Sequence, residues 1–309
     1  MRALLAYDAS PGADEAVSLL TTMPWPPGSA VRVVTVVEPS AAMVPSAPFA
    51  PPEPGASPEI EAQILDYRET ELARVLGVLR ASGLDAGGDV LRGRPATILV
   101  DEANRFAADL IVAGSRGHGP IASLVLGSVS AELVDHAPCP VLVARRSAAQ
   151  RVLFASDGSL SASDAEEVLV QWPIFNGTTM RVVSVAEVIR PWHTGLAPTI
   201  YRQVVDAYAK DLEAAKSEHA ALARGAAGRL ELAGRTVDDT VRVGDAAAEI
   251  LEEASTWRAD LIVLGSRGLT GLSRLLLGSV ARNVLQGTES SVLIVHDAAE
   301  TRSGGVQLK

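Results

Sequence analysis

The chain has 309 residues, of which 48% are hydrophobic, 21% are charged and 4% are aromatic. This length suits two domains of ordinary size, and the hydrophobic and charged contents argue against a disordered chain. The formal net charge of −10 at pH 7 disfavours a nucleic-acid binder, which needs basic side chains to meet the phosphates. The lone cysteine, Cys139, excludes an internal disulfide and is expected to be a small buried side chain.

Neither a signal peptide nor a membrane span is predicted. The apolar opening, MRALLAYD, is too short for a signal peptide, and no apolar run approaches the length of a transmembrane helix. We therefore expect a cytoplasmic protein with no membrane partner.

The two halves of the sequence repeat each other. RALLAYDAS at 2–10 matches RVLFASDGS at 151–159, and ADLIVAGSRG at 108–117 matches ADLIVLGSRG at 259–268. A repeat of this length indicates a duplicated domain. We place the boundary between 147 and 148, with the second domain ending near 300.

Each half alternates short apolar runs with helical stretches. In the first half the Val, Leu and Ile runs lie at 2–7, 31–37, 109–113 and 140–144. Such runs predict strands buried on both faces of a parallel sheet, and the stretches at 59–81 and 95–106 predict helices between them. The alternation predicts a doubly wound α/β domain. The Pro-rich stretch at 39–58 and its counterpart at 188–199 are expected to be loops that form flaps over each half.

One glycine pattern occurs twice, as GSRGHGPIASLVLGS at 114–128 and GSRGLTGLSRLLLGS at 265–279. In both copies the first two glycines follow a predicted strand, and the closing Gly-Ser pair opens a predicted helix. Ligands bind at that end of a parallel sheet, and the free amides of a helix N-terminus favour anions. Glycine also lets the main chain approach a phosphate closely. The pattern therefore predicts a phosphate-binding loop, to which Arg116 and Arg267 would add positive charge.

An alternative is that these glycines only close tight turns and that Ser128 and Ser279 only cap helices. Two copies in register, each between a strand and a helix, favour phosphate binding.

Both halves resemble the universal stress protein domain, in its ATP-binding branch, which carries Gly-x2-Gly-x9-Gly-Ser/Thr. The matching residues are Gly114, Gly117, Gly127 and Ser128 in the first half and Gly265, Gly268, Gly278 and Ser279 in the second. The resemblance covers nearly the whole chain. It implies two tandem domains of the adenine nucleotide alpha hydrolase-like type, each with a five-stranded parallel sheet of order 3-2-1-4-5. It also implies ATP across the ends of strands 1 and 4, with Mg²⁺ entering on the phosphates.

The resemblance implies further ATP-binding residues, namely Asp8, Val36 and Val129 in the first half and Asp157, Val185 and Val280 in the second. A carboxylate accepts hydrogen bonds from ribose hydroxyls or from the adenine amine. The alternatives are that the two acids cap the following helices and that Val36 and Val185 are plain core residues. We expect the halves to differ in affinity, with the second nearer the family pattern, because His118 and Pro120 make the first loop bulkier.

The sequence does not indicate an enzyme. No histidine recurs between the halves, so each is expected at the surface or in a loop, and no metal ligands cluster. The leading hypothesis is a nucleotide-responsive regulator or stress-response factor. The alternatives are an interaction protein with vestigial pockets and a slow ATPase.

The last predicted strands, at 139–146 and 290–298, would be unprotected sheet edges. Universal stress proteins commonly associate through this strand, so the resemblance implies that the two halves pair with each other. A homodimer of whole chains is left open.

Overall fold

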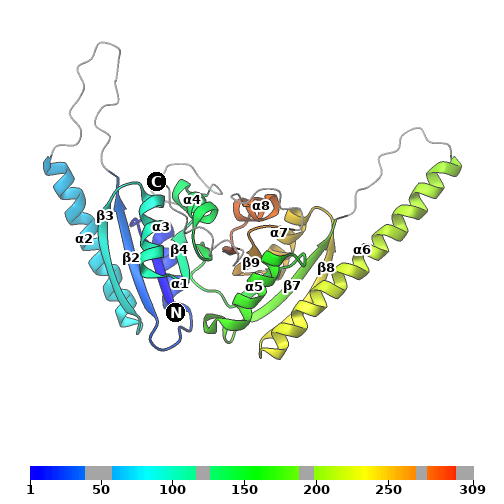
Figure 1. Cartoon of the computed structure of the whole chain (residues 1–309), viewed down its shortest axis with the longest axis horizontal. Coiled ribbons are helices and arrows are strands. Elements are labelled where there is room, and N and C mark those ends of the chain that lie inside the picture. The colour runs from blue at the N-terminus through cyan, green and yellow to red at the C-terminus, as the bar shows by residue number, and fades with distance from the viewer. Residues whose placement is uncertain (39–57, 116–125, 188–197, 269–276, 297–309) are drawn as a thin grey trace, which may run out of the picture. The chain divides into compact units, whose positions relative to one another are not determined.

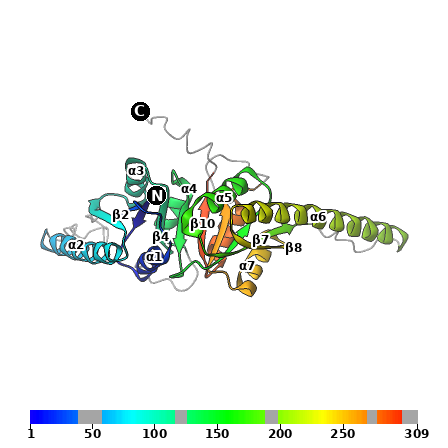
Figure 2. The same cartoon turned by 90° about the horizontal axis from the view of Figure 1, so that it is seen from below.

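The computed structural model describes residues 1–38, 58–115, 126–187, 198–268 and 277–296. The chain divides into two compact units, Met1–Ser147 and Ala148–Lys309. Each unit is an α/β domain with helices on both faces of a parallel sheet (Figures 1 and 2).

The first unit has its strands in the order β3-β2-β1-β4-β5, with every neighbouring pair parallel. The strands are β1 (Arg2–Ala6), β2 (Ala30–Val37), β3 (Asp85–Arg92), β4 (Leu110–Gly114) and β5 (Val141–Ala144). The helices are α1 (Pro11–Thr22), α2 (Pro58–Ala81), α3 (Pro95–Phe106) and α4 (Ser128–His136). Helices α1 and α2 pack against each other, as do α3 and α4.

The second unit repeats this topology as β8-β7-β6-β9-β10, again all parallel. Its strands are β6 (Arg151–Ala155), β7 (Thr179–Ala186), β8 (Thr236–Val243), β9 (Leu261–Gly265) and β10 (Ser291–Val295). Its helices are α5 (Leu160–Gln171), the 3-10 turn η1 (Pro173–Phe175), α6 (Pro198–Leu232), α7 (Ala246–Trp257) and α8 (Ser279–Gly287). The expected strand order 3-2-1-4-5 is thus confirmed in both halves.

Buried strands make the core, as the apolar runs predicted. Leu4 and Leu5 of β1 and Leu153 and Phe154 of β6 are at most 1% exposed. None of the helices in the described ranges is both long and apolar enough to cross a bilayer.

The same ion pair joins strand and helix in both units. Arg32 of β2 lies 3.0 Å from the buried carboxylate of Glu102 in α3, and Arg181 of β7 lies 3.0 Å from that of Glu253 in α7. A buried carboxylate needs such a partner, because an unpaired charge in the interior is strongly destabilising. We call each pair, with the elements that it joins, the basal clamp of its unit.

Candidate functional site

The second unit contains a cavity of about 570 Å³ at the carboxyl ends of β6, β7 and β9. All the residues predicted for the second-half site line it: Asp157, Val185, Gly265, Arg267, Gly268, Gly278, Ser279 and Val280. The structure therefore brings together residues that are more than a hundred positions apart in the sequence, around a space of the size that small molecules occupy.

The glycine loop ends in a helix N-terminus at this cavity. Gly278, at φ −60° and ψ 155°, is the N-cap of α8, and its own N–H donates to the Ser266 carbonyl at 2.8 Å. The first intrahelical bond runs from Arg282 N to Gly278 O. The first amides of a helix have no partner within it. Ser279 and Val280, which carry two of these amides, line the cavity, and a helix N-terminus favours an anion.

The α4 terminus in the first unit is built in the same way. Gly127 is its N-cap, Ser128 is its first helical residue, and Gly127 N donates to the Ser115 carbonyl at 2.9 Å. The alternative in which Ser128 and Ser279 act as caps is wrong, because the preceding glycine occupies the cap position in both units. Arg116 and Gly117 lie outside the described residues, as do 39–57 and 188–197, where flaps were expected.

Two of the repeated glycines are required by packing alone. An ideal Cβ on Gly265 would lie 2.6 Å from the Ser161 carbonyl carbon, and one on Gly114 would lie 2.4 Å from that of Gly12. Both strands thus end directly against the first turn of α1 or α5. Gly268 is different, because its Cβ would lie 2.8 Å from Asp157 Oδ2 at the cavity. There the absence of a side chain keeps space open beside the acid.

The two predicted acids occupy equivalent turns. Asp8 Oδ1 accepts a hydrogen bond from Ser10 N at 3.0 Å, and Asp157 Oδ1 accepts one from Ser159 N at 2.9 Å. The helix caps are Ser10 and Ser159, whose hydroxyls accept from the amides three positions on. The alternative in which the acids cap the helices is therefore wrong. Each acid instead closes the turn that follows the first strand of its unit.

The loop after β9 carries a buried hydroxyl that is unsatisfied within the described structure. Ser266 lines the cavity and is 3% exposed, and its Oγ finds no hydrogen-bond partner among the described residues. The neighbouring Arg267 backbone is held by the hydroxyls of Ser159 and Ser161 at the start of α5. Leaving a buried hydroxyl unpaired costs about 1–3 kcal/mol, so a bound group that completes it would be stabilised.

The family model described as the universal stress protein family matches residues 1–145 and 148–296. The chain belongs to the universal stress protein family.

Individual relatives agree with this assignment. A universal stress protein of Thermus aquaticus is 35% identical over 142 residues, which cover 46% of this chain and 96% of that protein. One from Mycobacterium tuberculosis is 30% identical over 223 residues, which cover 70% of each. Among solved structures, a universal stress protein from Archaeoglobus fulgidus matches 96% of this chain and 98% of its own, with a TM-score of 0.64 at 18% identity. That last likeness supports the fold.

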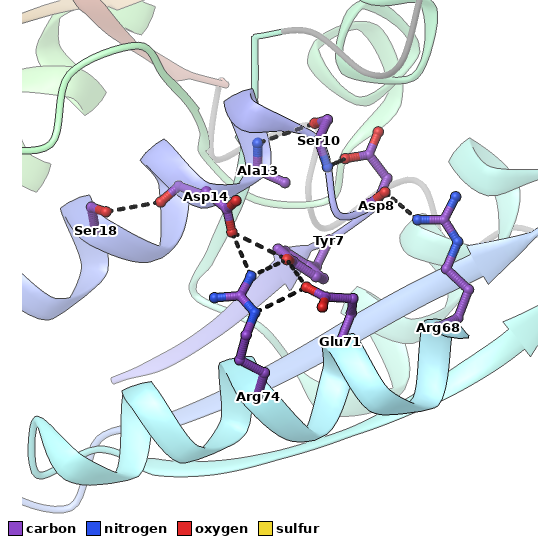
Figure 3. Close-up of polar contacts among 9 residues, drawn as sticks. All are labelled: Tyr7, Asp8, Ser10, Ala13, Asp14, Ser18, Arg68, Glu71 and Arg74. Carbon is purple, nitrogen blue, oxygen red and sulfur yellow. Dashed lines mark hydrogen bonds and ion pairs between the residues drawn. The ribbon is translucent and has the colours of Figure 1, made fainter. Parts of the chain in front are cut away.

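The first unit of this universal stress protein has a network of polar side chains at the end of its first strand (Figure 3). Tyr7 is 2% exposed, and its hydroxyl lies 3.1 Å from Asp14 Oδ1 and 3.3 Å from Glu71 Oε2. Arg74 donates to the Tyr7 hydroxyl at 2.7 Å, to Asp14 at 2.8 Å and to Glu71 at 2.9 Å. Burial raises the pKa of the Tyr7 phenol, and the Asp14 carboxylate raises it further. We call these four side chains the Tyr7 cluster; they tie β1 to α1 and α2.

Arg68 lies beside the Tyr7 cluster on the same helix and donates to the Asp8 carbonyl (Figure 3). Aligning the two halves on the turn glycines Gly83 and Gly234 places Arg68 opposite His219. The alignment also matches buried helix positions with each other: Leu72, Val75 and Leu79 with Ala223, Ala226 and Leu230.

His219 is the functional candidate that sequence reasoning missed. It was expected at the surface or in a loop, and that expectation is wrong: His219 lies on α6, is half-buried and lines the second-unit cavity. Its Nδ1 lies 2.8 Å from the hydroxyl of Ser184 in β7. The alignment with Arg68 would have pointed to it, since both are polar residues on the helix that follows the second strand.

Proposed function

We propose that this chain is a nucleotide-responsive regulator that binds ATP in each half. The observation that carries the proposal is the second-unit cavity. It combines the helix N-terminus of α8, a glycine whose Cβ would lie 2.8 Å from Asp157 Oδ2, and the unsatisfied hydroxyl of Ser266. Phosphates would lie at Gly268 and Ser279, where backbone amides and the helix dipole favour negative charge.

The remaining lining suits a nucleoside. Val183 and Val185 of β7 and Ala246 and Ile250 of α7 form an apolar side to the cavity, and Asp157 offers carboxylate oxygens to hydroxyl or amine donors. Magnesium would arrive on the ATP phosphates, because within the described residues no group of three or more His, Cys, Asp or Glu side chains is placed to hold a metal. On this proposal, nucleotide occupancy changes what the protein associates with, in the cytoplasm and as part of a stress response.

The test uses a charge placed at the phosphate position without disturbing the helix. Ser128 and Ser279 are exposed first residues of α4 and α8. Aspartate at this position stabilises a helix N-terminus, so Ser128→Asp and Ser279→Asp should fold normally. The added negative charge should repel the triphosphate and raise the Kd for ATP about tenfold or more. Ser255→Asp is the control for an added charge, because Ser255 is exposed and lies five residues along α7, about 7.5 Å, beyond Ile250, the last cavity residue on that helix.

Titration calorimetry on nucleotide-free protein should give about two ATP sites per chain, with one lost in each single variant and both in the double variant. The control variant Ser255→Asp should bind ATP with the same affinity as the wild type. If wild-type protein takes up no ATP, the proposal is wrong and the interaction-protein alternative gains. Phosphate release that disappears in the two aspartate variants would favour the slow ATPase.

We also propose, on the family resemblance, that the halves pair through their last strands. A Leu142→Cys, Leu293→Cys variant in a Cys139→Ser background should then form an internal disulfide. A variant that stays fully reduced under oxidising conditions would count against pairing, and a crosslinked species of twice the mass would indicate a homodimer instead.

A further inference from the structure

The hydrogen bonds behind His219 fix which of its nitrogens carries a proton. Ser184 is fully buried, and its Oγ lies 2.7 Å from the Ser156 carbonyl and 2.8 Å from His219 Nδ1. A hydroxyl has one proton and the carbonyl can only accept, so Ser184 donates to Ser156 O. The contact with the ring then requires a proton on Nδ1, donated to Ser184 Oγ. In the neutral ring this leaves Nε2 as a hydrogen-bond acceptor.

This arrangement belongs to the second half. The residue aligned with Ser184 is Thr35, which is 1% exposed and whose Oγ1 has no hydrogen-bond partner among the described residues. The residue aligned with His219 is Arg68, a side chain that can only donate. Only the second site therefore has an acceptor at this position on the helix.

The position of His219 points to the nucleoside part of a ligand. Its partner Ser184 lies in β7 next to Val183 and Val185, which line the cavity from the opposite face of that strand. The loop proposed for the phosphates comes instead from β9 and the start of α8. His219 thus borders the cavity at the β7 strand, where a base or ribose would lie.

We propose that His219 is a ligand-binding residue of the second-half site, whose Nε2 accepts a hydrogen bond from the nucleoside. The donor is an N–H or O–H group, which an adenine amine or a ribose hydroxyl supplies. This inference rests on the proposed function and adds that the two halves distinguish nucleosides differently: the second accepts a hydrogen bond where the first presents the donors of Arg68.

The experiment isolates the second site in the full-length Ser128→Asp protein. ATP, ITP, 2′-deoxy-ATP and 3′-deoxy-ATP are titrated into this protein and into variants that also carry His219→Phe, His219→Leu or His219→Gln. ITP replaces the amine with a carbonyl, and each deoxy nucleotide removes one hydroxyl. A lost hydrogen bond of ordinary strength weakens binding about three- to tenfold.

We expect Phe and Leu to weaken ATP by that factor, and one analogue to bind as weakly to the parent protein as ATP binds to the Phe variant. That analogue identifies the donor. Gln, which keeps an acceptor, should retain most of the affinity and the discrimination. The inference would be overturned if the Phe and Leu variants bound ATP as tightly as the parent does. It would also be overturned if they still discriminated between ATP and each analogue as strongly as the parent does. A parent that binds no ATP in its second site would instead overturn the proposed function.

A second measurement observes the His219 ring directly in the parent protein. In ¹⁵N-histidine-labelled protein, the resonances of His219, assigned by their loss in His219→Gln, should be those of the neutral ring protonated at Nδ1. Addition of ATP should shift the Nε2 resonance, whereas the analogue lacking the donor should not. A ring protonated at Nε2 in the ligand-free protein would contradict the hydrogen-bond assignment and with it the proposal.

Discussion

The two units share a frame and differ on one side of the site. Both have the turn closed by Asp8 or Asp157, the glycine at the helix N-cap and the basal clamp. They differ where α2 or α6 passes the end of the first strand. There the first unit carries the Tyr7 cluster, whereas the aligned residues of the second are Ser156, Ser163, Leu222 and Gly225. Small and apolar residues replace a charged network, and beside them lies the cavity with His219.

The comparison separates two kinds of requirement. Backbone turns and close packing are retained because they hold the sheet and helices together. The side chains from α2 and α6 are not needed for that, since two different sets support the same topology. The side chains on this side can therefore change without altering the fold.

The largest expected effect tests the shared frame. Gly265→Ala and Gly114→Ala should each destabilise the protein by about 3 kcal/mol or more, because the new Cβ meets helix backbone that cannot move aside. Gly87→Ala is the matched control, since nothing lies within 4 Å of its Cβ. Chemical denaturation measures the difference. Equal stability of the three variants would show that the strand and helix separate easily, and the packing argument would fail.

Removing the cation tests the Tyr7 cluster. Arg74→Met leaves the buried Tyr7 hydroxyl and two carboxylates without their common donor, so we expect a loss of about 1–2 kcal/mol. Lys216→Met, which removes an exposed Lys–Glu pair on α6, should cost well under 1 kcal/mol. The denaturant midpoints of the two variants, each compared with that of the wild type, measure the two losses. If they shift equally, the cluster adds no more than a surface ion pair.

A reciprocal exchange tests the turn after the first strand. Ala9 has φ 58° and the equivalent Gly158 has φ 77°, a region that costs an alanine about 1 kcal/mol. Ala9→Gly should therefore raise the melting temperature. Gly158→Ala should lower it more, because its Cβ would also lie 3.0 Å from Leu222 Cδ2. Two shifts of the same sign would contradict this account.

The smallest effect concerns Cys139, whose counterpart Ser290 donates to the Ala259 carbonyl at 2.7 Å. Burial, aided by Asp109, raises the pKa of the Cys139 thiol from 9.0 to about 12. The folded state holds this proton more tightly than the unfolded state does. The contribution of the thiol to the free energy of unfolding is therefore fully present below pH 9 and is lost as the pH rises from 9 toward 12. At pH 9.5 wild type should lose about 0.8 kcal/mol relative to Cys139→Ser, compared with pH 7.

Denaturation of both proteins at the two pH values measures this loss. If wild type and Cys139→Ser changed in stability by the same amount between the two pH values, the thiol would be in contact with solvent and its pKa would not be raised. Rapid modification of Cys139 by a thiol reagent in the folded protein would lead to the same conclusion.

Much of the fold could be predicted because the central strands are continuous apolar runs. Strand β3 gives a weaker signal: it carries Gly87 and Gly88 and is mostly exposed or half-buried, so no continuous apolar run marks it. Helix starts were harder to assign. Asp8 and Ser10 are both good caps, and the left-handed turn at Ala9 decides for Ser10.

The part of the candidate site that is built from backbone turns and regular residue spacing could be predicted from the sequence. The part that depends on which side chains a helix turns toward the sheet could be predicted less well. The glycine pattern and Asp157 identified one side of the cavity. The sequence places His219 on a helix, but only packing of α6 on β7 turns it toward Ser184. Likewise, the clash that excludes a side chain at Gly265 follows from how closely α5 approaches β9.

The basal clamps have a consequence for how such a chain evolves after duplication. In the second unit Arg181, which pairs with Glu253, also lies 5.2 Å from the Trp257 ring centroid, and Arg151 lies 4.6 Å from it. In the first unit Arg2 lies 4.4 Å from that of Phe106. Each copy thus carries its own anchor between sheet and helix. Substitutions around the two predicted sites can accumulate independently while both copies remain folded, so, if the proposed function is right, one gene can acquire two binding sites with different preferences.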